Sequence, residues 1–527
     1  MSFFVSRYIY WNMTCSGNAL KTDSGLFRGT HALLIAAAFM VPGAALAQTD
    51  ADEKIHQLEQ GIEAMNRQLE QIKGQVQDAK NKAALTEQRA QSQGVQYRFV
   101  DGVTFEDARG DWAVRASGRA QLDWRHYYPG GIVADTFSTR RLRLGLGATM
   151  YKRYSVYVEA DFASGDATGT TQQQSRATLA YLQATWGPPA TLRLGQFKPQ
   201  IGLEQTLLDL QSDFMERGLQ QNILDGNGIN YDRGIMLFGA PTPGTWYAVA
   251  VTNGTGQNLE EKQGNAQDIS ADTKDVTVRG VLDFAQMFAA SDNIYHIGAG
   301  YKWGKQANSP TSPFAAPFAR TEARGLTFFN AAAFNTTSGQ ASNIDRSMLA
   351  FELLLARGPT KLQAEYWIAE YAGTRAVPGP VVEYSPRINA GYVSAMWLIT
   401  GESYADFYFD SYIRKIKPRN RFDWGPDSGM GAWELGLRYS FLDASDFNNA
   451  NPVSTGQLAG TAAGVTPVVT TSANRATAYT AQVKWIQNAY TRVLLDYVRT
   501  NFETPVVANG QPYDHEAAVM MRFQVDF

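Results

Sequence analysis

Apolar and polar residues alternate along most of the chain from about residue 111 onward. In the last nine residues, 519–527 (VMMRFQVDF), every second position is apolar and the chain ends on Phe527. The same period recurs in residues 114–124, 139–149 and 433–441. Successive side chains of a β-strand point to opposite faces, so the pattern predicts strands with one apolar face. A soluble β-sandwich and a transmembrane β-barrel, whose apolar face meets lipid, both satisfy it.

Turn-forming residues divide this region into candidate strands. Short breaks near 151–152, 187–189 and 358–359 alternate with long polar stretches. The candidate strands start near residues 113, 138, 153, 175, 190, 231, 245, 275, 293, 345, 360, 388, 431, 477, 491 and 515. This even count predicts an all-β transmembrane barrel of 16 antiparallel strands. Residues 402–431 depart from this alternation of short turns and long polar stretches, because a short turn is expected there and the segment is long and basic.

Residues 52–90 follow a different period. Their apolar positions are spaced three and four apart, at Ile55, Leu58, Ile62, Met65, Leu69, Ile72, Val76, Ala79 and Ala83. This heptad repeat predicts an N-terminal α-helical coiled coil ahead of the barrel. The alternative is a lone amphipathic helix packed on a domain. The mixture of Ile, Leu and Met along the seam does not fix the number of helices that would associate.

The start of the chain carries a targeting signal. Residues 31–47 (HALLIAAAFMVPGAALA) form an apolar run that follows Lys21 and Arg28 and ends in small residues. Such a run is typical of a secretory signal peptide and is too short to span a membrane. We expect a signal peptide in residues 1–47, a periplasmic coiled coil and linker in 48–95, and a β-barrel in 96–527. The single cysteine, Cys15, lies in the leader, so the mature chain is expected to form no disulfide.

Composition narrows the classes of function. The net charge is −3, so no basic excess indicates a nucleic-acid partner. The histidines do not pair at metal-ligand spacing and no Gly-rich phosphate loop occurs, so no cofactor or metal is expected. An outer-membrane lipase would need a Ser and a His together on the barrel exterior. His126 lies beside Tyr127 and Tyr128, where an aromatic belt explains it better, so we expect no enzyme.

Five stretches of the chain carry a family resemblance. They are RRLRLGLGATMYKRYSVYVEADFA (140–163), LRLGQFKPQIGLEQ (192–205), DFMERGL (213–219), GAWELGLRYSFLDASD (431–446) and VKWIQNAYTRVLLDYVRT (483–500). Together they resemble the phosphate-selective porin O and P family. The resemblance implies a porin of the bacterial outer membrane, surrounded by lipid, usually trimeric, with a basic lumen that favours small anions such as phosphate or pyrophosphate. It does not specify the solute.

Because alternate residues of a strand point to the same face, the pattern predicts which residues would line such a lumen. An anion loses hydration in a narrow pore, and fixed Arg or Lys charges offset that loss. Arginine offers a planar fork for phosphate oxygens, whereas lysine acts as a point charge. The candidates on strands, or next to them, are Arg115, Arg119, Arg141, Arg143, Arg193, Lys198 and Arg233. The long segment 201–230, expected to fold into the lumen, adds Glu204, Asp213, Glu216 and Arg217.

Other interpretations stay open. A lumen arginine often pairs with a neighbouring carboxylate and only braces the wall, and Asp123, Glu159 and Asp161 are available partners. A general, sugar or peptide porin would have the same architecture without an anion site. In a third reading the barrel has a structural role, and the coiled coil tethers it to another envelope layer such as peptidoglycan.

Overall fold

The structure is a computed structural model. It describes residues 47–92, 96–99, 102–163, 175–226, 228–257, 274–290, 292–308, 317–331, 342–376, 381–426, 428–447 and 473–527. Contacts between residues divide the chain into two units, residues 1–96 with 106–111 and residues 97–105 with 112–527. The expected signal peptide lies outside the described residues, except for Ala47.

The first unit contains one helix among its described residues, α2 (Ala47–Ser92). It covers the whole segment with the heptad repeat. The seam residues from Ile62 to Val76 are between 49% and 64% exposed in the single chain, so the apolar stripe is available to a partner. The coiled coil itself stays a prediction. No helix in the described part of the chain is both long and apolar enough to cross a membrane.

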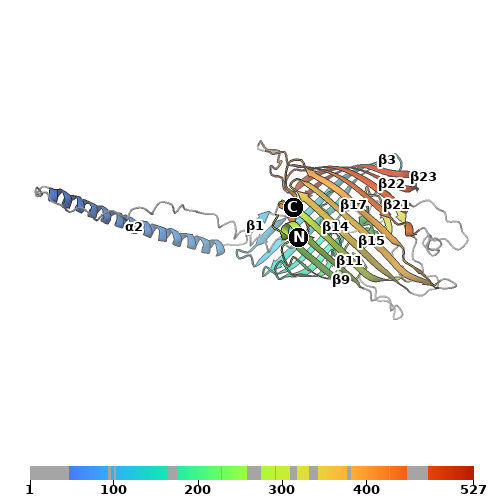
Figure 1. The fold of residues 1–527 in the computed structure, drawn as a ribbon, viewed down its shortest axis with the longest axis horizontal. Helices are drawn as coiled ribbons and strands as arrows, with labels where there is room; N and C mark the ends of the chain where they lie inside the picture. The colour runs from blue at the N-terminus through green and yellow to red at the C-terminus, as the bar shows by residue number, and fades with distance from the viewer. Residues whose placement is uncertain are drawn as a thin grey trace. The chain divides into compact units, whose positions relative to one another are not determined.

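The second unit is a closed antiparallel barrel (Figure 1). Its sixteen described strands are β3 (Trp112–Tyr128), β4 (Thr136–Met150), β5 (Tyr154–Asp161), β6 (Arg176–Thr185), β7 (Thr191–Phe197), β8 (Asp232–Gly239), β9 (Thr245–Thr252), β10 (Asp275–Asp283), β11 (Asn293–Asn308), β14 (Ser342–Arg357), β15 (Thr360–Ala376), β17 (Arg387–Leu398), β20 (Ala432–Asp443), β21 (Arg475–Ile486), β22 (Thr491–Ala508) and β23 (Gln511–Asp526). Each strand pairs with the next along the chain, and β23 pairs with β3. The sixteen-stranded barrel is therefore confirmed, and every strand begins within four residues of its predicted start.

The last residue helps to close the barrel. The backbone N–H of Phe527 donates to the Gly118 carbonyl at 2.9 Å, and the Gly118 N–H donates to the Phe527 carbonyl at 3.0 Å. A Cβ on Gly118 would lie 2.5 Å from the Phe527 ring, so only glycine lets the ring lie over β3. The terminal aromatic that ends the sequence pattern thus packs across the closing strand pair.

The barrel wall carries apolar side chains on its outer face and polar side chains on its inner face, which is the reverse of a soluble protein. Outward side chains such as Leu144, Leu437 and Phe523 are exposed, whereas inward ones such as Arg279 and Arg522 are almost completely buried. An apolar exterior with a polar interior is the pattern of a barrel in lipid. The alternation in the sequence therefore belongs to a membrane barrel and not to a sandwich.

Two parts of the barrel wall differ in strand length, with β3 and β4, of 17 and 15 residues, between them. The six strands β5 to β10, called here the short wall, contain 7 to 10 residues each. The strands β11, β14, β15, β17, β20, β21, β22 and β23, called the tall wall, contain 12 to 18 residues each. A tilted transmembrane strand needs about 9–11 residues. Four strands of the short wall, β5, β7, β8 and β9, fall below that length.

Three connections fold into the interior. The first is the β7–β8 loop, with α3 (Leu203–Thr206), η1 (Leu219–Gln221) and α4 (Asn222–Asp225). The second carries the hairpin β12 (Phe318–Arg320) and β13 (Thr327–Asn330) between β11 and β14. The third lies between β17 and β20 and carries η3 (Tyr404–Phe407), β18 (Tyr408–Phe409) and β19 (Tyr412–Ile413). The remaining described elements are short additions at the barrel ends: β1 (Gln96–Phe99), β2 (Val103–Glu106), β16 (Val381–Tyr384), α5 (Phe284–Met287) and η4 (Ser445–Phe447).

Candidate functional site

The β7–β8 loop crosses the lumen and is tied to the opposite wall. Glu365 on β15 accepts hydrogen bonds from the backbone N–H groups of Leu203 at 2.5 Å and Glu204 at 3.1 Å. These N–H groups open the short helix α3 and have no partner within the helix. Asp496 on β22 accepts the N–H of Met215 at 2.9 Å. Acidic side chains of the barrel interior therefore hold the loop across the channel.

One loop carboxylate lies at the centre of a basic cluster. The Asp209 carboxylate lies 2.7 Å from Arg143, 3.0 Å from Arg217, 3.2 Å from Arg141 and 3.7 Å from Lys198. Burial raises the pKa of Asp209, but the surrounding cations outweigh burial and hold this pKa well below its ordinary value. The carboxylate therefore stays ionised and joins loop to wall. We call this set, with Asp209 at its centre, the Asp209 cluster.

The wall arginines nominated from the sequence are largely braced. Arg119 donates to Glu159 at 2.6 Å. Arg143 also donates to Asp161 at 2.7 Å. Arg115, which is paired with Gly147 in the strand register, makes no ion pair with a described residue. Bracing therefore accounts for Arg119 and for part of Arg143, while Arg141 faces the lumen with Asp209 as its carboxylate partner.

Lys198, at the start of the loop, is the residue of the cluster whose positive charge is most easily lost by deprotonation. Burial lowers the pKa of its ammonium group to about 7, Asp209 opposes this shift, and the neighbouring Arg217, Arg143 and Arg141 add to it. Its Nζ atom donates to the Leu207 carbonyl at 3.3 Å. The positive charge of the cluster therefore depends on pH close to neutrality.

Arg193 occupies a different environment. Its guanidinium lies over the rings of Tyr181 at 4.2 Å and Phe238 at 4.8 Å. It also donates to the Gln183 amide oxygen at 2.9 Å. No described carboxylate lies within ion-pair distance of it. Arg233, the other strand candidate, lies 3.4 Å from the Gln196 amide oxygen.

A second basic group surrounds Glu216 farther along the loop. Its carboxylate accepts from Arg125 at 2.6 Å, from Arg140 at 2.7 Å and from Arg522 at 3.2 Å. Arg522 is also bidentate to Asp123, at 2.7 and 2.8 Å. Burial raises the pKa of Glu216, but its arginine partners, Arg140 first, outweigh burial and hold the pKa well below its ordinary value. Glu216 was nominated from the sequence, whereas Arg125 and Arg140 were not.

Arg140 was missed for an identifiable reason. Gln121 pairs with Arg141 and Leu122 pairs with Thr139, so Arg140 is an extra residue in β4. Such a β-bulge lets two consecutive side chains reach the same face. Strict alternation would place Arg140 toward lipid, so parity alone could not find it. The run of two arginines at 140–141 was the only available signal.

The other nominated loop residues meet the opposite wall. Asp213 accepts from Lys361 at 2.5 Å. Arg438 lies 3.4 Å from Glu204 and donates to Glu322, in the β12–β13 hairpin, at 2.8 Å. Arg438 and Glu322 were not nominated, because nothing in the sequence indicates that the hairpin enters the lumen.

The long basic segment between β17 and β20 fills the other end of the lumen. Tyr404 and Ile413 from this segment pack in one buried cluster with Leu203 and Phe214 of the β7–β8 loop. The Ser411 hydroxyl accepts a hydrogen bond from Arg279 on β10 at 3.0 Å. This segment and the β7–β8 loop therefore meet inside the barrel.

Comparison with known proteins identifies related sequences. The family model described as "Phosphate-selective porin O and P" matches residues 114–527. Porin O of Pseudomonas aeruginosa is 24% identical over 434 residues, which cover 79% of this chain and 89% of that protein. Among solved structures, OprB of Pseudomonas putida gives a TM-score of 0.47 at 11% identity, covering 79% of this chain and 94% of that one. A loop-deletion mutant of OmpT from Vibrio cholerae gives 0.44 at 10% identity, covering 79% and 100%.

Proposed function

Because this chain belongs to the phosphate-selective porin O and P family of outer-membrane porins, we propose that it favours small oxyanions, phosphate or pyrophosphate in the first place. The Asp209 cluster carries this proposal. Four cations converge there on a single loop carboxylate. An oxyanion that enters this region meets guanidinium and ammonium groups that are already gathered and partly desolvated.

The balance of charge supports an anion rather than a cation. Around the cluster, Arg119, Arg141, Arg143, Lys198 and Arg217 face Asp209, Glu159 and Asp161, which makes five cations against three carboxylates. The shared carboxylate keeps any one site weak. A channel needs binding that is favourable enough for entry and weak enough for release. Several partly compensated arginines meet both conditions.

Titration of the chloride current with phosphate tests the proposal. We expect inorganic phosphate to reduce the single-channel chloride current of the wild-type protein in a planar bilayer. In the double variant Arg141→Gln/Arg143→Gln the half-blocking phosphate concentration should rise at least about tenfold, because charge-assisted hydrogen bonds contribute about 1.5–3 kcal/mol each.

Arg499→Gln is the matched control for this titration. Arg499 is an exposed residue of β22 whose Nε donates to Asn501, so its loss removes one charge outside the lumen. Phosphate should reduce the chloride current of this variant at the same concentrations as in the wild type. A wild-type chloride current that phosphate does not change would contradict the anion proposal and favour a general, sugar or peptide porin.

We also propose that the protein is a homotrimer that associates through its short wall. Strands of 7 or 8 residues such as β7 and β9 do not reach across a bilayer unaided. The outward side chains here are mostly small and aliphatic, for example Val158, Leu182, Leu194, Ile235 and Val249. Burying this face against a second copy would remove it from lipid. Tethering of the coiled coil to peptidoglycan stays a prediction.

A further inference from the structure

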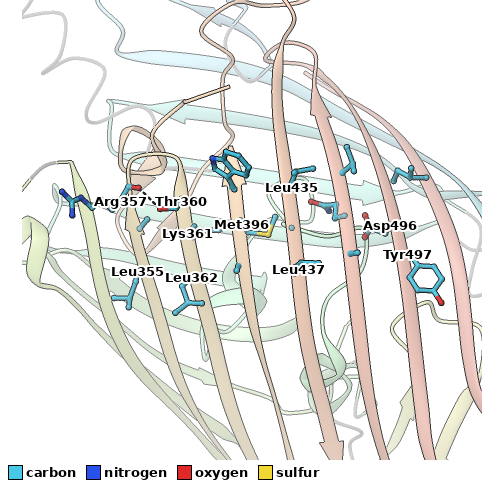
Figure 2. Close-up of a pocket in the computed structure, with 18 of the residues that line it drawn as sticks. Leu355, Arg357, Thr360, Lys361, Leu362, Met396, Leu435, Leu437, Asp496 and Tyr497 are labelled. Carbon is cyan, nitrogen blue, oxygen red and sulfur yellow. Dashed lines mark hydrogen bonds between the residues drawn. The ribbon is translucent and has the colours of Figure 1, made fainter. Parts of the chain in front are cut away.

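The exterior of the tall wall carries a hollow of about 1090 Å³ (Figure 2). Its lining residues come from β11, β14, β15, β17, β20, β21, β22 and β23. The strand register explains it. Leu362 pairs with Ala395, Ala395 with Leu437, Leu437 with Ala481, and Ala481 with Tyr497. Two alanines in an outward-facing row of larger side chains leave a depression in an otherwise filled surface.

The wall that carries the hollow has the features of a surface that faces lipid. Trp397, Trp433 and Trp485 lie on its outward face, near the ends of their strands on the side of the barrel where most turns are short. Tyr439 and Tyr479 lie farther along the same strands. Aromatic residues at both interfaces are typical of the lipid-facing band of a barrel. The short wall carries mostly aliphatic side chains instead, so hydrocarbon is the expected surroundings of the hollow.

One cation lies at the rim of the hollow. Arg357 and Leu355 are on the same strand and face, so Arg357 lies about 7 Å nearer the rim at about 3.4 Å per residue. The turn that follows is short, because Arg357 pairs with Thr360, whose hydroxyl donates to the Arg357 carbonyl at 3.0 Å. Arg357 is exposed, and no described carboxylate lies within ion-pair distance of it.

We propose that the hollow binds one acyl chain of a glycerophospholipid whose phosphate pairs with Arg357. The short turns of outer-membrane barrels face the periplasm, which places Arg357 at the headgroup level of the periplasmic leaflet. The guanidinium fork matches phosphate oxygens, and the apolar hollow below it accepts the chain. This site lies outside the lumen and does not depend on which solute the channel conducts.

Native mass spectrometry tests the site on the full protein. The barrel is reconstituted with dioleoylphosphatidylglycerol, returned to detergent, and measured for retained lipid. We expect one tightly held lipid per barrel in the wild type. Arg357→Gln should weaken retention about tenfold through the lost charge-assisted contact. Ala481→Phe should weaken it by a similar factor, because the new ring fills the hollow.

Matched variants separate binding from general damage. Ala364→Phe makes the same change at an outward alanine of β15 that does not line the hollow. Arg499→Gln removes an outward arginine elsewhere on the tall wall. Both should retain lipid like the wild type, and heat-dependent migration in SDS verifies that each barrel is folded.

Three results would overturn the proposal. The first is a wild type that retains no lipid. The second is a folded Arg357→Gln or Ala481→Phe protein with wild-type retention. The third is loss of the trimer, rather than of lipid, in Ala481→Phe, which would show that a second copy covers the hollow.

Discussion

Two charged groups on opposite sides of the lumen differ in how their charges are matched. In the first group the Glu352 carboxylate, on β14, lies 2.8 Å from the Arg279 guanidinium, on β10, and 3.1 Å from the His296 ring, on β11. All three side chains are at most 1% exposed. On the other side, four cations share Asp209, which belongs to a loop rather than to a strand. In the first group one arginine, Arg279, balances one carboxylate, Glu352, and we call these two residues the matched pair. The second group gathers more positive charge than its carboxylate neutralises.

The comparison shows that a lumen arginine is not by itself an anion site. A buried ion pair with matched charges fixes geometry, and removing one partner leaves the other unpaired at high cost. A cluster with surplus charge and a carboxylate on a loop can instead exchange that carboxylate for a solute. The two groups should therefore respond in opposite ways to substitution.

The largest effect is expected at the matched pair. Arg279→Gln leaves the Glu352 carboxylate without its bidentate partner, and breaking a buried pair costs about 3–5 kcal/mol. The temperature at which the folded barrel loses its heat-dependent migration in SDS should fall clearly. The double variant Arg279→Gln/Glu352→Gln should recover most of the loss and keep the wild-type ion selectivity. A changed ion selectivity in that double variant would show that Arg279 and Glu352 also act on the passing ions, and would contradict the comparison.

A smaller effect of opposite kind is expected at the cluster. Asp209→Asn removes the carboxylate that the four cations share, so a phosphate oxyanion can take its place. The half-blocking phosphate concentration should fall several-fold, while Glu352→Gln should leave it unchanged. Equal blocking in Asp209→Asn and the wild type would show that solutes do not reach these cations.

The smallest effect is a pH dependence that Lys198 gives to the cluster. The pKa of Lys198 is lowered to about 7, so its ammonium group is protonated below neutrality and loses its charge above it. Anion selectivity, measured as a reversal potential, should therefore decline as the pH rises from 6 to 8. Lys198→Arg keeps its charge over this range and should remove most of the decline. A decline of the same size in Lys198→Arg would assign the titration to another group.

The sequence predicted most of the barrel because its period reflects the physics of lipid on one side and water on the other. Alternation located the strands, and turn residues separated them. The same rule failed at Arg140, where a β-bulge adds one residue and turns its side chain into the lumen. Alternation describes regular strands and carries no information on bulges.

The site was predicted less completely, for a different reason. Asp209 and Glu322 lie in irregular segments, where no period relates a residue to the wall it contacts. The segment 402–431 was recognised as unusually long and basic, but its entry into the lumen depends on tertiary packing of Tyr404 and Ile413. Long-range contacts of this kind leave no local pattern in a single sequence.

The reversal potential in a salt gradient tests the central claim most directly. The claim is that surplus positive charge at the Asp209 cluster makes the channel favour anions. In a planar bilayer with unequal potassium chloride concentrations, the wild type should give a reversal potential of the sign for chloride preference. Arg141→Gln/Arg143→Gln should move it toward zero. A cation-selective wild type, or a reversal potential that the double variant leaves unchanged, would contradict the account.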